Sequence, residues 1–247
     1  MILFFVFLFG LVIGSFLNVL IGRLPEGESI VNPPSHCEAC DTTLKAQDLI
    51  PLISWFLLRG KCRYCGEKIH YRYPLTEFVN GIAWVLIIWQ FGLTYQGLAG
   101  LFLFSLFLAI ALIDLEHYII PNGLVLALLV GGIIYHFLTP DLTLVQRLLG
   151  LAVGFAVPVV IALISRGGMG GGDIKLMATM GFWLGFGGIL ITLFIAALIG
   201  SIIGIALIIS GRKKRKDPIP FGPFLVIGFL LIFLYGEQLL YLYWSIF

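Results

Sequence analysis

Two aspartates lie where apolar segments of the chain give way to unusual polar sequence. Asp114 ends an apolar run and stands seven residues before Pro121, which stops a helix. Asp173 follows residues 167–172, five of which are glycine, and should open the next helix at its positive end. Ionisable side chains beside apolar spans are costly and are therefore candidates for function. If the two carboxyl groups meet, one can take a proton from water while the other hydrogen-bonds a scissile carbonyl, and a peptide bond is hydrolysed.

The same residues also allow readings without peptide hydrolysis. Asp173 could cap a helix, Asp114 could be solvated at an interface, and the glycines could be helix-packing positions. A proton-coupled transporter would use both aspartates as a relay, and a membrane scaffold would use neither. No serine has the Gly-x-Ser-x-Gly context of a nucleophile. The residues alone leave these alternatives open.

All four cysteines form two CxxC pairs, with 21 residues between the pairs. The ligands predicted for a metal are Cys37, Cys40, Cys62 and Cys65. Two thiolates from each tight turn can share a tetrahedral Zn²⁺, which lets a segment too small for a good core fold. Two disulfides or idle thiols are the alternative, and a reducing compartment disfavours the disulfides. Because four thiolates leave no coordination position for water, the zinc should be structural.

The elements that position these residues are predicted to lie in a membrane. Apolar residues make up 60% of the 247-residue chain and charged residues only 11%, against roughly 25% charged in soluble domains. This composition excludes an ordinary soluble domain and a disordered chain, and no basic stripe favours nucleic-acid binding. The apolar runs cover residues 1–21, 75–91, 98–113, 123–138, 148–164, 176–209 and 221–247.

The long run around residues 175–209 is predicted to fold in two. As one helix its 35 residues would span about 52 Å, more than the ~30 Å hydrocarbon core. The cluster of Gly185, Gly187 and Gly188 is the expected break, giving helices over 174–184 and 189–209. The fold class is therefore an all-α polytopic membrane protein with about eight transmembrane helices.

Charge placement predicts the orientation and the domains. Seven Lys or Arg residues fall in residues 22–73 and five in residues 212–216, so both loops should be cytoplasmic. Both aspartates then emerge on the cytoplasmic side of a multi-pass protein in contact with membrane lipid. The expected organisation is a first transmembrane helix (1–21), a cytoplasmic four-cysteine zinc module (22–73) and a seven-helix core (74–247).

Several motifs together resemble the bacterial type IV prepilin peptidases. The matching residues are Gly14-Ser15-Phe16-Leu17-Asn18-Val19, the two CxxC pairs, Tyr73-Pro74-Leu75-Thr76-Glu77, Asp114 with Pro121-Asn122, and Gly170-Gly171-Gly172-Asp173-Ile174-Lys175-Leu176. The Gly-x-Gly-Asp element is shared with other intramembrane aspartyl proteases. Its combination with the paired-cysteine loop is specific to the bacterial family.

This resemblance implies an aspartyl endopeptidase of the bacterial inner membrane, with Asp114 and Asp173 as its catalytic pair. It implies removal of the short basic leader from type IV prepilins or pseudopilins, in pilus, type II secretion or competence systems. Many members then N-methylate the new N-terminal residue with S-adenosylmethionine, and no residue pattern in the chain independently indicates where that cofactor binds.

Two further polar residues lie in the matching motifs. Asn18 is expected mainly to hydrogen-bond across helices, although a contact with substrate or cofactor is the alternative. Glu77 is expected near Arg72, Lys175 or a lysine of the leader, and its role stays open. Lys175 itself is expected to reach the lipid headgroups.

Overall fold

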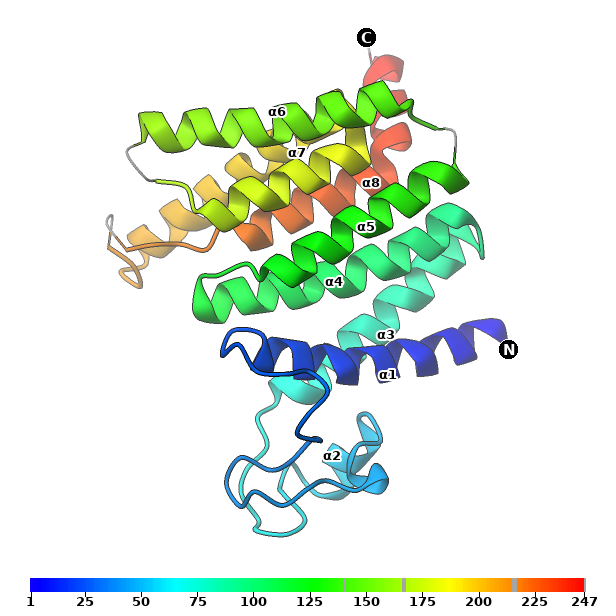
Figure 1. Cartoon of the computed structure of the whole chain (residues 1–247), viewed down its shortest axis with the longest axis vertical. Helices are drawn as coiled ribbons and strands as arrows, with labels where there is room; N and C mark the ends of the chain where they lie inside the picture. The colour runs from blue at the N-terminus through cyan, green and yellow to red at the C-terminus, as the bar shows by residue number, and fades with distance from the viewer. Residues whose placement is uncertain (140, 166–167, 215–216, 247) are drawn as a thin grey trace. The chain divides into compact units, whose positions relative to one another are not determined.

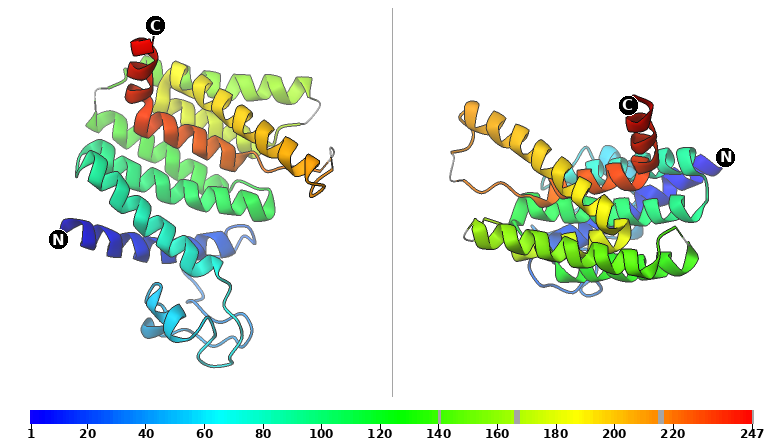
Figure 2. Two further views of the ribbon diagram at one scale, coloured as in Figure 1. Left: turned by 180° about the vertical axis from the view of Figure 1, so that it is seen from behind. Right: turned by 90° about the horizontal axis from the view of Figure 1, so that it is seen from above.

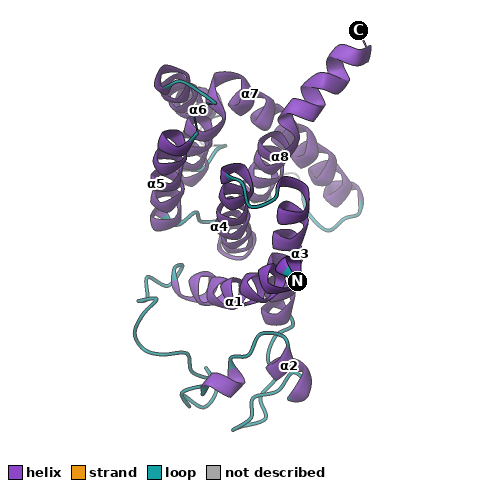
Figure 3. Ribbon diagram, turned by 90° about the vertical axis from the view of Figure 1, so that its right-hand side faces the viewer, coloured by secondary structure: helices purple, strands orange, loops and turns teal. Residues whose placement is uncertain are grey.

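The computed structural model describes residues 1–139, 141–165, 168–214 and 217–246, with side chains to residue 236 in the last helix. The glycine run before Asp173 and the basic loop at 212–216 therefore lie partly outside the described residues. The helices are α1 (Ile2–Arg23), η1 (Ala46–Asp48), α2 (Ile53–Leu57), α3 (Arg72–Phe91), α4 (Tyr95–His117), α5 (Asn122–Leu138), α6 (Leu144–Ile164), α7 (Gly171–Ile209) and α8 (Gly222–Ile246). The described part holds helices and loops without a strand (Figure 3).

The all-α fold expected from composition is confirmed. Within the described residues, five helices are long and apolar enough to cross a membrane: α1, α3, α4, α6 and α7. Two shorter apolar helices accompany them, α5 and the Gly222–Gly236 part of α8. Two compact units result, residues 1–109 and 110–247, and their boundary falls inside α4.

The break expected in the long apolar run is confirmed at Gly185. This residue has φ +70° inside α7, a left-handed backbone conformation that glycine adopts without strain. The two parts of α7 run in opposite directions on either side of it (Figures 1 and 2). The first part begins at Gly171, three residues before the predicted start, and so includes Asp173. With α7 divided there, the described chain has eight apolar helical segments in the predicted order.

In the first unit, α1 packs against α3 through buried polar contacts. The Asn80 side chain donates to the Gly10 carbonyl at 2.7 Å. Ser105 of α4 donates to the Asn80 amide oxygen at 2.9 Å and accepts from the Trp84 indole at 2.9 Å. Hydrogen bonds between helices replace those that water cannot supply in an apolar layer. These contacts fix α1 against α3 and the start of α4.

In the second unit, α6 lies along the first part of α7 (Figure 1). Gly150 and Gly154 of α6 face the backbone of α7, and a Cβ at either would collide with the carbonyl oxygens of Gly181 and Met177, respectively. Small residues let two backbones approach closely where lipid supplies no hydrophobic drive between helices.

A buried arginine bridges α6 and the kink of α7. Arg147 is fully buried, and its guanidinium donates to the Phe182 and Trp183 carbonyls at 3.3 and 3.2 Å. These carbonyls precede the kink at Gly185, where the helical hydrogen-bond ladder is interrupted. The same guanidinium donates to Asp141 at 2.6 Å. Asp141 thus neutralises the charge of Arg147, and the guanidinium N–H groups satisfy backbone carbonyls beside the kink.

Replacing Arg147 with methionine should therefore destabilise the second unit by about 2 kcal/mol, because the Phe182 and Trp183 carbonyls lose their buried donor. Arg212→Met is the matched control, because the same exchange there occurs on an exposed side chain of the same unit. Thermal unfolding of the full chain in detergent measures both. Equal melting temperatures for the two variants would contradict a structural role for Arg147.

Candidate active site and metal centre

Asp114 lies in the last turn of α4, and its side chain is 5% exposed. The backbone N–H of Gly222, the first residue of α8, donates to Asp114 Oδ2 at 2.9 Å. An ideal Cβ on Gly222 would lie 2.7 Å from that oxygen, so a larger residue would push the carboxyl group away. The last helix therefore begins against the aspartate and supplies one hydrogen bond to it.

Asp173 is the third residue of α7, where the helix dipole favours a negative charge. The Gly170 backbone hydrogen-bonds its carboxyl group, while Gly170 itself is the N-cap residue of α7. The other carboxyl oxygen, Oδ1, is buried without a hydrogen-bond partner among the described residues. A buried carboxyl oxygen lacking a partner marks a place for water or a ligand.

The two aspartates, 59 residues apart in the sequence, line one cavity of about 230 Å³. Their carboxyl groups are close enough to interact electrostatically. The remaining lining residues are Tyr118, Ile119, Ile120, Asn122, Gly170, Gly171, Gly172 and Lys175. Two carboxyl groups sharing one proton can provide both a general base and a hydrogen-bond donor.

The polar rim of this cavity is tied to neighbouring segments. Exposed Lys175 donates to the Asn122 side chain, at the start of α5, at 3.0 Å, and its expected contact with lipid headgroups stays a prediction. The Tyr118 hydroxyl accepts from Lys213 at 3.2 Å. Tyr118 itself has φ +57°, and this left-handed turn ends α4 just after Asp114.

The structure adds Gly222 to the residues that sequence reasoning placed at the site. A backbone donor has no side-chain signature in a sequence. The available signal was its position between Pro220 and Pro223, just where a new apolar helix begins.

In the first unit the four cysteines come together on two matching turns. The Cys37 and Cys62 backbone N–H groups donate to the Thr42 and Glu67 carbonyls, at 3.0 and 2.7 Å, and close the turns. In both turns the residue after the second cysteine has positive φ, +52° at Asp41 and +75° at Gly66. The two turns therefore present their sulfur atoms in the same way.

The four sulfur atoms lie within 4.8 Å of one another, and the cluster could hold a metal ion. The Cys37 and Cys65 sulfurs are 3.8 Å apart, which matches the edge of ~3.8 Å of a tetrahedron with Zn–S bonds of ~2.3 Å. All four cysteines are free thiols, so the disulfide alternative is not what the structure holds.

Protonation differs across the cluster. Backbone hydrogen bonds from Cys65 and Tyr64 lower the pKa of the Cys62 thiol to about 7. For Cys65 a backbone hydrogen bond from Glu67 opposes the change, but burial and the neighbouring thiols raise its pKa to about 12. So many sulfur atoms cannot all be ionised together unless a cation neutralises them.

The other two motif residues take partners within the first unit. Asn18 Nδ2 donates to the Tyr73 carbonyl at 3.1 Å, which confirms a bond across helices. Glu77 is held by groups of its own unit, and a pairing with a lysine of the leader stays a prediction. Its carboxylate accepts from the Leu52 backbone N–H at 2.8 Å and hydrogen-bonds Ser15.

Comparison with known proteins agrees with this arrangement. Residues 8–91 match the family model of the bacterial peptidase A24 N-terminal domain, and residues 101–205 match that of the type IV leader peptidase family. No solved structure matches the chain.

Several relatives are named prepilin leader peptidase/N-methyltransferase. The protein from Bacillus subtilis is 35% identical over 96% of this chain and 96% of its own length. The Xanthomonas campestris protein is 36% identical over 93% of this chain and 90% of its own. The Aeromonas hydrophila protein is 35% identical over 95% of this chain and 91% of its own length. With both family models matched in order and relatives aligned over nearly the whole length, the chain belongs to the type IV leader peptidase family.

Proposed function

We propose that this protein is a prepilin leader peptidase of the bacterial inner membrane, with Asp114 and Asp173 as its catalytic dyad. The observation that carries the proposal is the shared cavity of these two carboxyl groups. The names of the relatives supply the substrate class, type IV prepilins or pseudopilins, and the second activity, N-methylation of the new N-terminus. The family membership favours hydrolysis over proton-coupled transport by the same aspartates.

The dyad would act by general acid–base catalysis. The ionised carboxylate takes a proton from a water molecule, whose oxygen forms a bond to the scissile carbonyl carbon. The protonated carboxyl group hydrogen-bonds the carbonyl oxygen, on which negative charge develops. Collapse of the tetrahedral intermediate breaks the C–N bond, and a proton from the dyad passes to the leaving amine. The Gly222 N–H already donates to Asp114, whereas Asp173 Oδ1 has no partner among the described residues. The attacking water would therefore hydrogen-bond Asp173 Oδ1.

The cytoplasmic side is the expected location of this reaction. Basic leaders stay on the cytoplasmic side under the same charge rule that places the basic loops of this chain there. The apolar helix that follows a leader enters the bilayer, so the bond to be cut lies near the membrane surface. Asp114 and Asp173 stand at the end of one apolar helix and the start of another, which suits that depth.

The cysteine cluster is proposed to bind a structural Zn²⁺. Four thiolates complete a tetrahedral shell and leave no site for a reacting water. The segment between α1 and α3 has only η1 and α2 as regular structure, so metal binding would stabilise its fold.

Replacing either aspartate with asparagine should reduce leader removal at least ~100-fold, because one proton-transfer partner is lost. Asp41→Asn is the matched control, since this exposed carboxylate lies outside the cavity. Cleavage of a co-expressed prepilin is read by mass spectrometry, with membrane insertion checked by fractionation. Near-normal cleavage in either dyad variant would reject the mechanism.

Gly222→Ala tests whether the start of α8 positions Asp114. The added methyl group would displace the carboxyl group, and misplacement on this scale costs about 100-fold in rate. Gly123→Ala is the control, because a Cβ there meets nothing within 4 Å. Prepilin cleavage in isolated membranes should separate the two variants, and equal rates would contradict the positioning role.

The protein purified under reducing conditions without chelator should contain about one zinc per chain. Elemental analysis measures it, and Cys62→Ser should lose most of the metal. Metal loss should also make the segment between α1 and α3 sensitive to limited proteolysis. A metal-free protein whose segment resists protease would refute the zinc site.

A further inference from the structure

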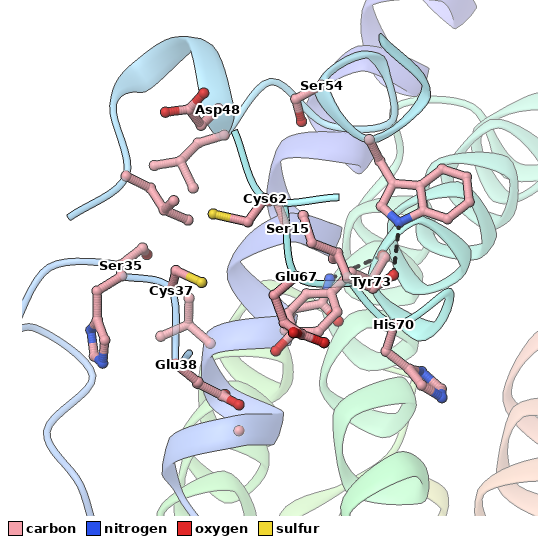
Figure 4. A pocket seen from close by; sticks show the side chains of 18 of the residues that line it. Ser15, Ser35, Cys37, Glu38, Asp48, Ser54, Cys62, Glu67, His70 and Tyr73 are labelled. Carbon is pink, nitrogen blue, oxygen red and sulfur yellow. Dashed lines mark hydrogen bonds between the residues drawn. The ribbon is translucent and has the colours of Figure 1, made fainter. Parts of the chain in front are cut away.

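A second and larger cavity, of about 780 Å³, lies in the first unit and has no part in the proposed hydrolysis. Side chains from α1, from the cysteine-bearing segment and from the start of α3 surround it, as Ser15, Cys62 and Tyr73 show (Figure 4). Its volume is within the range of small-molecule sites. It is thus a separate candidate for a ligand.

Negative charge dominates its walls. Six carboxylates line the cavity, against three Lys or Arg side chains. The carboxylates are Glu26, Glu28, Glu38, Asp48, Glu67 and Glu77, and the cations are Arg23, Arg63 and Lys68. Arg63 pairs with Asp48 at 2.6 Å, and Arg23 donates to backbone carbonyls. The remaining charges favour a cationic ligand.

One buried acceptor in this wall has no partner. Asn18 is 5% exposed, and its Nδ2 donates to the Tyr73 carbonyl, while its Oδ1 has no hydrogen-bond partner among the described residues. Leaving a buried amide oxygen unsatisfied costs free energy, so such a group indicates a missing donor. A ligand with N–H groups would supply it.

A buried carboxylate stands in the same wall. Glu77 is 8% exposed, and the Leu52 N–H and the Ser15 side chain hold it in place. Aromatic side chains complete the lining: Trp55, whose indole donates to the Ile69 carbonyl at 3.2 Å, and Tyr73. The cavity therefore combines fixed negative charge, a free acceptor and aromatic surface, which together suit a cationic ligand that has an N–H group and an aromatic ring.

We infer that this cavity binds S-adenosylmethionine, the donor for the N-methylation in the proposed function, on which the inference rests. Glu77 complements the positive sulfonium, and the other carboxylates complement the ammonium group. Asn18 Oδ1 accepts a hydrogen bond from an N–H group of S-adenosylmethionine. Trp55 and Tyr73 provide aromatic faces against which its adenine can pack. The cofactor supplies a methyl group. As the C–N bond to the neutral amine forms, the C–S bond breaks, the sulfur leaves as a neutral thioether and the amine releases a proton.

The experiment compares two ligands that differ in charge. S-adenosylmethionine carries the sulfonium, and S-adenosylhomocysteine has a neutral sulfur. Isothermal titration of the full-length, zinc-loaded protein in detergent gives the affinity for each. Glu77→Gln should weaken S-adenosylmethionine at least ~10-fold and S-adenosylhomocysteine much less, because only the former loses a charge–charge contact.

Asn18→Leu should weaken both ligands, since it removes an acceptor and not a charge. Asp41→Asn, an exposed carboxylate outside the cavity, should bind both ligands normally. Each variant is also assayed for leader cleavage, which the Glu77 and Asn18 substitutions should leave within a few fold of wild type.

Unchanged affinities in the Glu77 and Asn18 variants, with methylation intact, would overturn the site while leaving the proposed function standing. Equal losses for the two ligands in Glu77→Gln would overturn the role of its charge. Normal binding of both ligands with impaired leader cleavage would show that the cavity takes the basic leader instead. A wild-type protein that cleaves prepilin but neither binds S-adenosylmethionine nor methylates would remove the methyl-transfer half of the proposed function.

Discussion

A carboxyl group at the edge of an apolar layer needs hydrogen-bond donors that water supplies only in part, and this constraint shapes the second unit. The Gly222 backbone N–H donates to one oxygen of Asp114, and the Gly170 backbone hydrogen-bonds one oxygen of Asp173, whose Oδ1 has no partner among the described residues. Both donors come from helix starts, whose N–H groups have no partner within the helix. The N-terminal ends of α7 and α8 therefore both lie at the cavity that holds the two aspartates.

In the first unit, buried polar groups are satisfied by side chains as well as by the backbone. Asn80, Ser105 and Trp84 form a chain of hydrogen bonds between α1, α3 and α4. Glu77 receives a backbone donor from the segment just before α2. This contact ties the cysteine-bearing segment to α3, and residues of both line the larger cavity.

Sequence predicted the helices because their apolar runs are long. It placed a break at the cluster of Gly185, Gly187 and Gly188 because a single helix of that length exceeds the thickness of a bilayer. The aspartates stood out because charges are rare beside such runs. Arg147 lies just before the apolar run predicted over residues 148–164. In the structure α6 begins at Leu144 and includes Arg147, whose side chain is buried. Its partners are carbonyls freed by a kink elsewhere in the chain, and that pairing, like the N–H of Gly222, is visible only in three dimensions.

The reversal of α7 at Gly185 also governs how this protein enters a bilayer. A segment that doubles back returns to the surface from which it started, so it adds an even number of crossings. A straight helix in its place would add one and would deliver α8, together with its contact to Asp114, to the opposite leaflet. The left-handed backbone of Gly185 thus determines that the start of α8 lies on the same side of the bilayer as Asp114.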